Sequence, residues 1–142
     1  MKTNLYKMIA AMIAIIFSLL TIVEGSTVLL GISLQDYTVF TPLLVYNVIM
    51  GIVGLFAGGI IWFNPKEAMT YTKIILAAHI TVMVIVIFIH LLSTTVAMHS
   101  VQAMIVRVLV WVVIALLTWK SNQSIINKNI TDKLSKGKND EK

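Results

Sequence analysis

The residues with the clearest chemical potential are two charged side chains within apolar sequence. Glu24 interrupts an apolar run from Met8 to Ile32, and Arg107 interrupts another in the C-terminal half. A carboxyl that exchanges a proton or contacts a ligand, and a guanidinium that binds a propionate, a carboxylate or a lipid phosphate, are the chemistries this pair offers. The alternative is a buried ion pair that only holds two helices in register.

The three histidines offer a second chemistry, because imidazole is a common ligand of haem iron and transition metals. His79 and His90 are eleven residues apart, which returns both to one helix face about 16 Å apart along the axis. Haem b bound through His90 and His99 is one interpretation, and a transition-metal site of Glu24, His90 and His99 is another. The remaining interpretation is that each histidine only hydrogen-bonds across helices.

The elements that would position these residues are membrane-spanning helices. The chain is 58% hydrophobic and 12% charged, with a mean hydropathy of +0.93, whereas soluble domains carry about a quarter charged residues. Apolar stretches at about 8–31, 41–63, 73–93 and 97–119 each reach the roughly 20 residues that a helix needs to cross a bilayer. We therefore expect an all-α integral membrane protein, with an antiparallel four-helix transmembrane bundle in residues 1–120 and a basic tail in residues 121–142.

The lysines predict the orientation of this bundle. All ten lie before the first stretch, between the second and third, or after the fourth. The positive-inside rule then predicts that both termini are cytoplasmic, in what we expect to be a bacterial cytoplasmic membrane. In the tail, apolar residues at helical spacing from Ile125 to Leu134 predict an amphipathic helix on the membrane, followed by a disordered end. Nucleic-acid binding is not expected, because the basic tail lacks interleaved aromatic residues.

Depth along the predicted helices places several polar residues at one level in the outer half of the bundle. The rise of a helix brings Glu24, Asn47, His90 and Gln102 to similar depths, and the long side chain of Arg107 reaches the same level from the centre. This predicts a polar site lined by Glu24, Asn47, His90 and Arg107, with Tyr46, Gln102, His99 and His79 as second choices.

Small residues predict where two helices pack closely. Gly51, Gly54 and Gly58 share one face of the second stretch, and the last two form a GxxxG motif, which permits close backbone approach. The first stretch has a similar face, so we expect the two helices to be neighbours; its members are Ala11, Ala14, Ser18, Thr21 and Gly25. The alternatives for the glycine face are a homo-oligomer seam and a space for a flat ligand.

The sequence Glu24-Gly25-Ser26-Thr27 resembles the small multidrug resistance exporters, which are short four-span proteins with a glutamate in the first span. The resemblance covers about a dozen residues and implies that Glu24 exchanges protons for cations. The one-sided lysines, Arg107 and the tail depart from the dual topology typical of that family.

The leading functional expectation is binding of a ligand or cofactor within a membrane redox or sensing system. Proton-coupled transport of a small molecule or cation through Glu24 is the second, and a structural subunit of a larger membrane complex is the third. An enzyme is the least favoured class, because Glu24 is the sole acid in the predicted spans and no serine has a histidine and acid arranged as in a catalytic triad.

Overall fold

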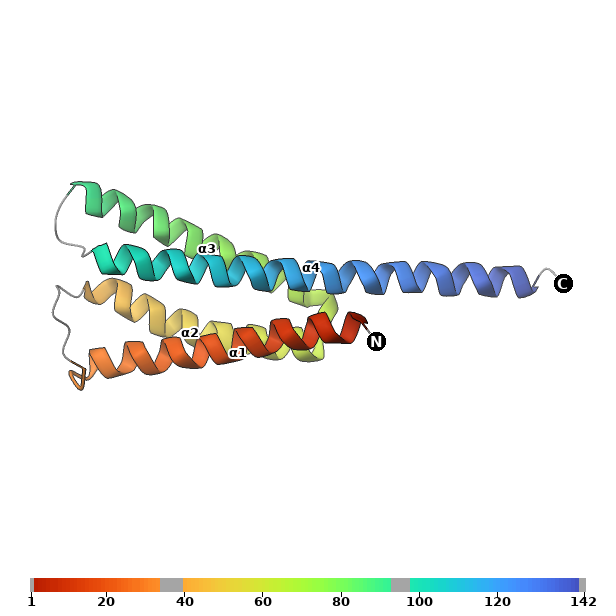
Figure 1. Ribbon diagram of the computed structural model, residues 1–142, viewed down its shortest axis with the longest axis horizontal. Coiled ribbons are helices and arrows are strands. Elements are labelled where there is room, and N and C mark those ends of the chain that lie inside the picture. The colour runs from red at the N-terminus through yellow and green to blue at the C-terminus, as the bar shows by residue number, and fades with distance from the viewer. Residues whose placement is uncertain (1, 34–39, 93–97, 141–142) are drawn as a thin grey trace.

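The computed structural model describes residues 2–33, 40–92 and 98–140, and all its regular structure there is helical. The helices are α1 (Lys2–Leu29), α2 (Thr41–Phe63), α3 (Pro65–Leu92) and α4 (Met98–Asp140). Each contains a segment long and apolar enough to cross a membrane, which confirms the all-α prediction and is consistent with an integral membrane protein. Successive helices run in opposite directions (Figure 1). We call the end where α1 and α3 finish the loop end, and the opposite end the terminal end.

Three of the helices extend beyond the apolar stretches that predicted them. Helix α2 covers the expected residues, but α1 begins at Lys2 and α3 begins at Pro65. Hydropathy locates only the apolar part of a helix, whereas the polar residues that precede these stretches are themselves compatible with helix. Proline is tolerated in the first turn, where its missing N–H would have no helical partner.

The tail differs more from its expectation, because it is the continuation of α4. This helix has 43 residues and runs unbroken from Met98 to Asp140, so in Figure 1 it projects past the rest of the bundle in the direction of the span. The expected separate surface helix and disordered end are therefore wrong for residues 121–140. No proline lies between Thr118 and Asp140, and the lone Gly137 costs only about 1 kcal/mol in a helix.

The four helices form a ring in chain order. Helix α1 packs most extensively on α2, and α3 on α4, while α4 closes the ring against α1 and α2 has the smallest of the four interfaces with α3. Between α2 and α3 only Asn64 is outside a helix. Its N–H donates to the carbonyl of Ile60 at 2.7 Å, and its own carbonyl accepts from the N–H groups of Glu67 and Ala68. This single residue therefore both ends α2 and starts α3.

The glycine face of α2 packs against α1 of the same chain. A Cβ added at Gly58 would lie 2.6 Å from Ile15 Cγ1, and one at Gly54 would collide with Ser18. Both helices expected to be neighbours are therefore in contact, as predicted from their small residues. This face, which includes Gly51, Gly54 and Gly58, is buried against α1, and the alternative of a homo-oligomer seam stays a prediction.

Two adjacent glycines give a matched test of this packing. We expect Gly58→Ala to destabilise the protein by about 1 kcal/mol, because overpacking a close contact forces neighbouring groups to move. Gly59 has no heavy atom within 4 Å of an added Cβ, so Gly59→Ala should leave stability unchanged or slightly raised. Thermal melting of both variants in one detergent measures the difference. Equal losses in the two variants would show that the α1–α2 contact at Gly58 is not responsible.

A polar layer divides the buried core. One apolar cluster, toward the terminal end, includes Trp111 and Ile114, and a smaller one toward the loop end contains Leu43, Val86, Val101 and Met104. Along α2, α3 and α4, one buried polar residue lies between members of the two clusters: these residues are Asn47, His79 and Arg107. Buried polar groups need partners, so this layer is where the fold can hold a site.

Candidate functional site

Arg107 is the centre of the polar layer. It projects from α4, and its side chain is only 8% exposed. Three hollows meet at this residue, with volumes of about 380, 60 and 10 Å³. A buried guanidinium keeps its charge and carries five N–H donors that need acceptors. The arrangement around Arg107 therefore determines which chemistry the site can perform.

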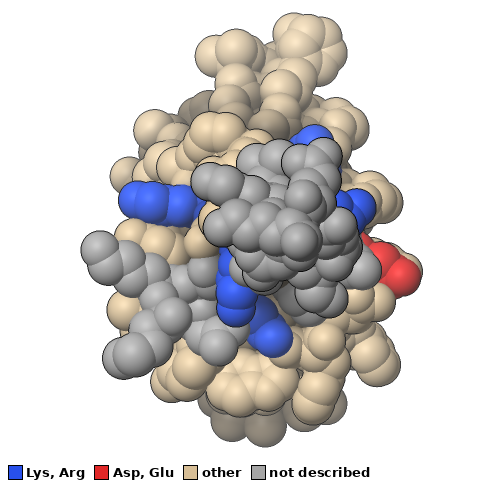
Figure 2. Space-filling view, turned by 90° about the vertical axis from the view of Figure 1, so that its right-hand side faces the viewer, with Lys and Arg blue, Asp and Glu red and all other residues tan. Residues whose placement is uncertain are grey.

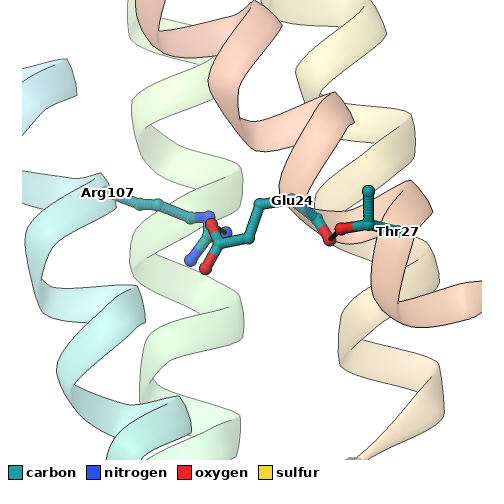
Figure 3. Close-up of polar contacts among 3 residues, drawn as sticks. All are labelled: Glu24, Thr27 and Arg107. Carbon is teal, nitrogen blue, oxygen red and sulfur yellow. Dashed lines mark hydrogen bonds and ion pairs between the residues drawn. The ribbon is translucent and has the colours of Figure 1, made fainter. Parts of the chain in front are cut away.

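Glu24 approaches Arg107 from α1, and Figure 3 shows the two side chains pointing toward each other. Glu24 Oε2 lies 3.9 Å from Arg107 Nη2, and the glutamate side chain is 72% exposed. This distance permits electrostatic attraction but exceeds that of a hydrogen bond. The hydroxyl of Thr27 donates to the backbone carbonyl of Glu24 at 2.9 Å, so it fixes the helix and not the carboxylate. The carboxylate is thus a loose partner for a buried cation.

Two buried polar atoms beside this pair lack hydrogen-bond partners. Within the described residues these include Arg107 Nε and Asn47 Oδ1, and Asn47 is only 6% exposed. Leaving a buried donor or acceptor without a partner costs about 1–3 kcal/mol. Flipping the Asn47 amide exchanges its oxygen and its nitrogen. The buried amide atom without a partner is therefore either an acceptor or a donor. A ligand that bonds both groups would recover this cost.

The largest hollow is a groove between α1 and α4, which we call the α1–α4 groove. It has a volume of about 380 Å³ and is lined by Phe17, Leu20, Thr21, Glu24, His99, Gln102, Ala103, Val106 and Arg107. Apolar side chains make up much of its wall, with the Glu24–Arg107 pair among the polar groups. Its size falls within the range of sites for small organic ligands, about 300–1,000 Å³.

The second hollow, which we call the small pocket, lies toward α2. Its volume is about 60 Å³, and its polar lining consists of Glu24, Asn47, His99, Ser100 and Arg107. Because Glu24, His99 and Arg107 line both this pocket and the groove, the two spaces share a wall at the ion pair. A molecule with a polar end and an apolar end matches these two environments.

His79 lies on the other side of Arg107, against a cavity of about 10 Å³ that also touches Ser18 and Trp111. Its Nδ1 is 3.2 Å from the hydroxyl of Tyr46, and the Trp111 ring is 6.1 Å away by ring centroids. With the Tyr46 hydroxyl as donor, Nδ1 is the acceptor and the proton is on Nε2. These contacts hold the histidine as part of the core.

Comparison with known proteins adds no assignment. No family model, curated protein or solved structure matches this chain. The functional argument therefore depends on the side chains around Arg107.

The structure brings some of the expected site residues together and separates others. Glu24, Asn47 and Arg107 line the small pocket, and Gln102 joins Glu24 and Arg107 in the groove. Tyr46 contacts His79 instead, and His90 lines none of the three hollows. His90 was predicted for this polar site from its depth, and depth along a helix does not specify the face on which a residue lies.

The metal site of Glu24, His90 and His99, one interpretation of the sequence, is not assembled among the described residues. Across the described residues, which include His79, His90, His99 and Glu24, no three His, Asp or Glu side chains gather closely enough to hold a metal ion. Each of the three hollows has a single histidine in its lining. His79 and His90 belong to α3 and His99 belongs to α4, and spacing along one helix does not show which residues of a second helix lie beside it.

Several lining residues were not expected from the sequence. Phe17 and Thr21 precede Glu24 by seven and three residues, and Ser100 and Ala103 precede Arg107 by seven and four. Residues at these spacings share a helix face. Projecting the helical period outward from the two charged residues would have identified them, whereas a search for polar residue types does not.

Proposed function

We propose that the chain is a multi-pass membrane protein that binds an amphipathic molecule with an anionic head group. The observation that carries this proposal is the buried Arg107: among the described residues its Nε has no hydrogen-bond partner, and the acid paired with it, Glu24, is exposed and 3.9 Å away. Carboxylates, phosphates and sulfonates present several acceptor oxygens, and arginine binds such planar or branched oxyanions through paired N–H groups.

The small pocket is the place for the head group. Arg107 supplies donors there, and the Asn47 amide supplies an additional polar contact from α2. A volume of about 60 Å³ accommodates a compact oxyanion but excludes a hydrocarbon chain. Hydrogen bonds to a charged partner in a poorly solvated site contribute more than those at a wet surface.

The α1–α4 groove is the place for the apolar part. Phe17, Leu20 and Val106 offer hydrocarbon contacts there, which contribute about 25 cal/mol per Å² of apolar surface removed from water. A chain seated in this groove would be continuous with a head group at Arg107, since the same ion pair borders both spaces. We therefore favour a lipid-like amphiphile over a small hydrophilic anion.

A binding or sensing role fits this arrangement better than a haem role. A bis-histidine haem needs two imidazoles on opposite sides of one cavity, and none of the three hollows at Arg107 has two histidines. Many amphiphiles carry an anionic head group, whether or not they take part in redox chemistry. The proposed head-group site therefore gives no specific support to a redox role.

Calorimetric titration with two sulfonates tests the proposal. Octanesulfonate and methanesulfonate carry the same anionic head, but only the first has a chain for the groove. We expect the purified protein to bind octanesulfonate measurably and methanesulfonate at least about 100-fold more weakly, because each buried methylene contributes about 0.8 kcal/mol. Equal affinities would indicate a free-anion site, and no binding of either would refute the proposal.

Proton-coupled cation export is the second candidate, favoured by the exposure of Glu24 in the groove. In that function a cation competes with Arg107 for the carboxylate. Tetraphenylphosphonium would then bind to the wild type, and removal of the Arg107 charge would strengthen its binding. The proposed anion site predicts the opposite preference, so the two candidates separate on the sign of the ligand charge.

The distribution of lysines carries a topology prediction. Figure 2 views the terminal end, where basic side chains gather; the exposed lysines Lys73, Lys120 and Lys128 belong to the helix segments there. We expect this end to face the cytoplasm. A phosphatase reporter, which works only outside the cytoplasm, should be inactive when fused after Lys142, and a fluorescent protein should be bright. The reverse pattern would place the site in the inner half of the membrane.

A further inference from the structure

We propose that binding of the anionic head at Arg107 is accompanied by uptake of one proton on Glu24. This inference rests on the proposed function, because it describes how the same site accepts an anion. It follows from the geometry of the pair: Glu24 is the acid that faces Arg107, yet it is held at 3.9 Å and remains 72% exposed.

The charge balance of the site provides the first argument. Before a ligand binds, the positive charge of Arg107 and the negative charge of Glu24 cancel across the shared wall of the two hollows. A bound oxyanion that contacts Arg107 leaves two negative groups beside one positive group. Like charges a few ångströms apart repel strongly where water is scarce, so protonation of one of them is favoured.

The identity of the proton acceptor follows from which groups can respond. A sulfonate head remains ionised, and Arg107 is already protonated. Glu24 lines both the small pocket and the groove, so its carboxylate can accept a proton there without entering the core. The new O–H bond also makes Glu24 a donor, able to contribute a hydrogen bond to the anion that displaced it from Arg107.

The other ionisable groups near Glu24 define the controls. Helix α4 contributes Arg107 and His99 to the same hollows, whereas α2 contributes the neutral Asn47. On the far side of Arg107 lie Tyr46 and His79, which contact each other. Among these groups His99 is the direct rival for the proton, because it also lines both hollows.

Calorimetry in two buffers measures the proton. Titrations of the detergent-solubilised full-length protein with octanesulfonate in Bis-Tris and in Tris, at one pH, give the number of protons taken up from the difference in heat. We expect about one proton per ligand where Glu24 is ionised, and an affinity that rises about tenfold for each unit by which the pH falls. The sign follows because the protonated carboxyl is the form that favours the bound anion.

Two variants assign the proton to its residue. Glu24→Gln should bind octanesulfonate with no proton uptake and with an affinity that does not vary with pH, and at alkaline pH it should bind more tightly than the wild type. His99→Gln should still take up the proton. Uptake that persists in Glu24→Gln, or disappears in His99→Gln, would overturn the assignment.

Other outcomes separate this inference from the proposed function. Binding by the wild type without proton uptake would refute the inference and leave the anion site standing, whereas absence of binding at every pH would refute the site itself. The charge of Glu24 could also be balanced by a positive group on the ligand instead of a proton. An octyl sulfobetaine, which carries its own positive charge, tests this alternative. Tighter binding of this zwitterion than of octanesulfonate, without a proton, would show that Glu24 pairs with a ligand cation and overturn the inference.

Discussion

Arg107→Met is expected to lower the affinity for octanesulfonate by at least about 30-fold, because truncating one partner of a buried charged hydrogen-bonded pair costs about 2–5 kcal/mol. The methionine keeps much of the volume and the apolar stem of the arginine but provides no donor for the head group. Calorimetric titration at a fixed acidic pH, where the wild type binds most tightly, measures this loss directly.

A matched control is available on the same helix. Leu109 is 58% exposed and lines none of the three hollows, so Leu109→Met introduces the same residue without altering the site. It should bind octanesulfonate as the wild type does. Arg107→Lys should fall between the two, because an ammonium keeps the charge but loses the paired N–H geometry. Wild-type affinity in Arg107→Met would place the ligand elsewhere.

Glu24→Gln is expected to destabilise the ligand-free protein more than Arg107→Met does. Removing the carboxylate leaves the buried guanidinium without its acid, whereas removing the guanidinium leaves an exposed carboxyl that can become neutral by protonation. Breaking a buried pair costs about 3–5 kcal/mol. We expect about 2 kcal/mol for Glu24→Gln, because that partner is exposed and the pair is long.

Thermal melting of the two single variants and the double variant measures the coupling. The double variant Glu24→Gln with Arg107→Met should be more stable than Glu24→Gln alone, because it contains no buried unpaired charge. From the sequence alone, replacing Arg107 by alanine is expected to cost more than the double change with Glu24→Gln, because the single change leaves a carboxyl that must stay protonated or unpaired in the bundle. Additive losses would show that the two side chains do not interact.

Apolar runs predicted most of the fold, but they did not predict how far three of the helices extend. Helix α2 is bounded by a proline at its start and by Asn64 at its end, and both signals are local. The polar start of α1 has no such signal, whereas α3 begins at Pro65, directly after Asn64. The continuation of α4 past Trp119 was missed because a change in composition was taken for the end of a helix, although polar residues continue a helix wherever no proline interrupts it.

Site residues could be predicted where a residue type is unusual for its surroundings. Glu24, Asn47 and Arg107 were expected from their polarity within apolar stretches, and the structure places them around one pocket. The face that each helix turns toward the interior of the bundle could not be predicted, because it depends on how the four helices are rotated relative to one another. This is why His90, which was predicted from its depth, is absent from the lining of the three hollows, and why Tyr46 was not paired with His79.

The unbroken course of α4 gives the molecule a mechanical property. Arg107 and the exposed Lys133 belong to one helix that continues to Asp140, and the segment from Arg107 to its end is about 50 Å long at 1.5 Å per residue. A hydrogen-bonded helix resists twisting, so a rotation of α4 that re-aims Arg107 also turns the lysines beyond the bundle through a similar angle. The helix thus transmits rotation along its length, and its projecting end turns together with Arg107.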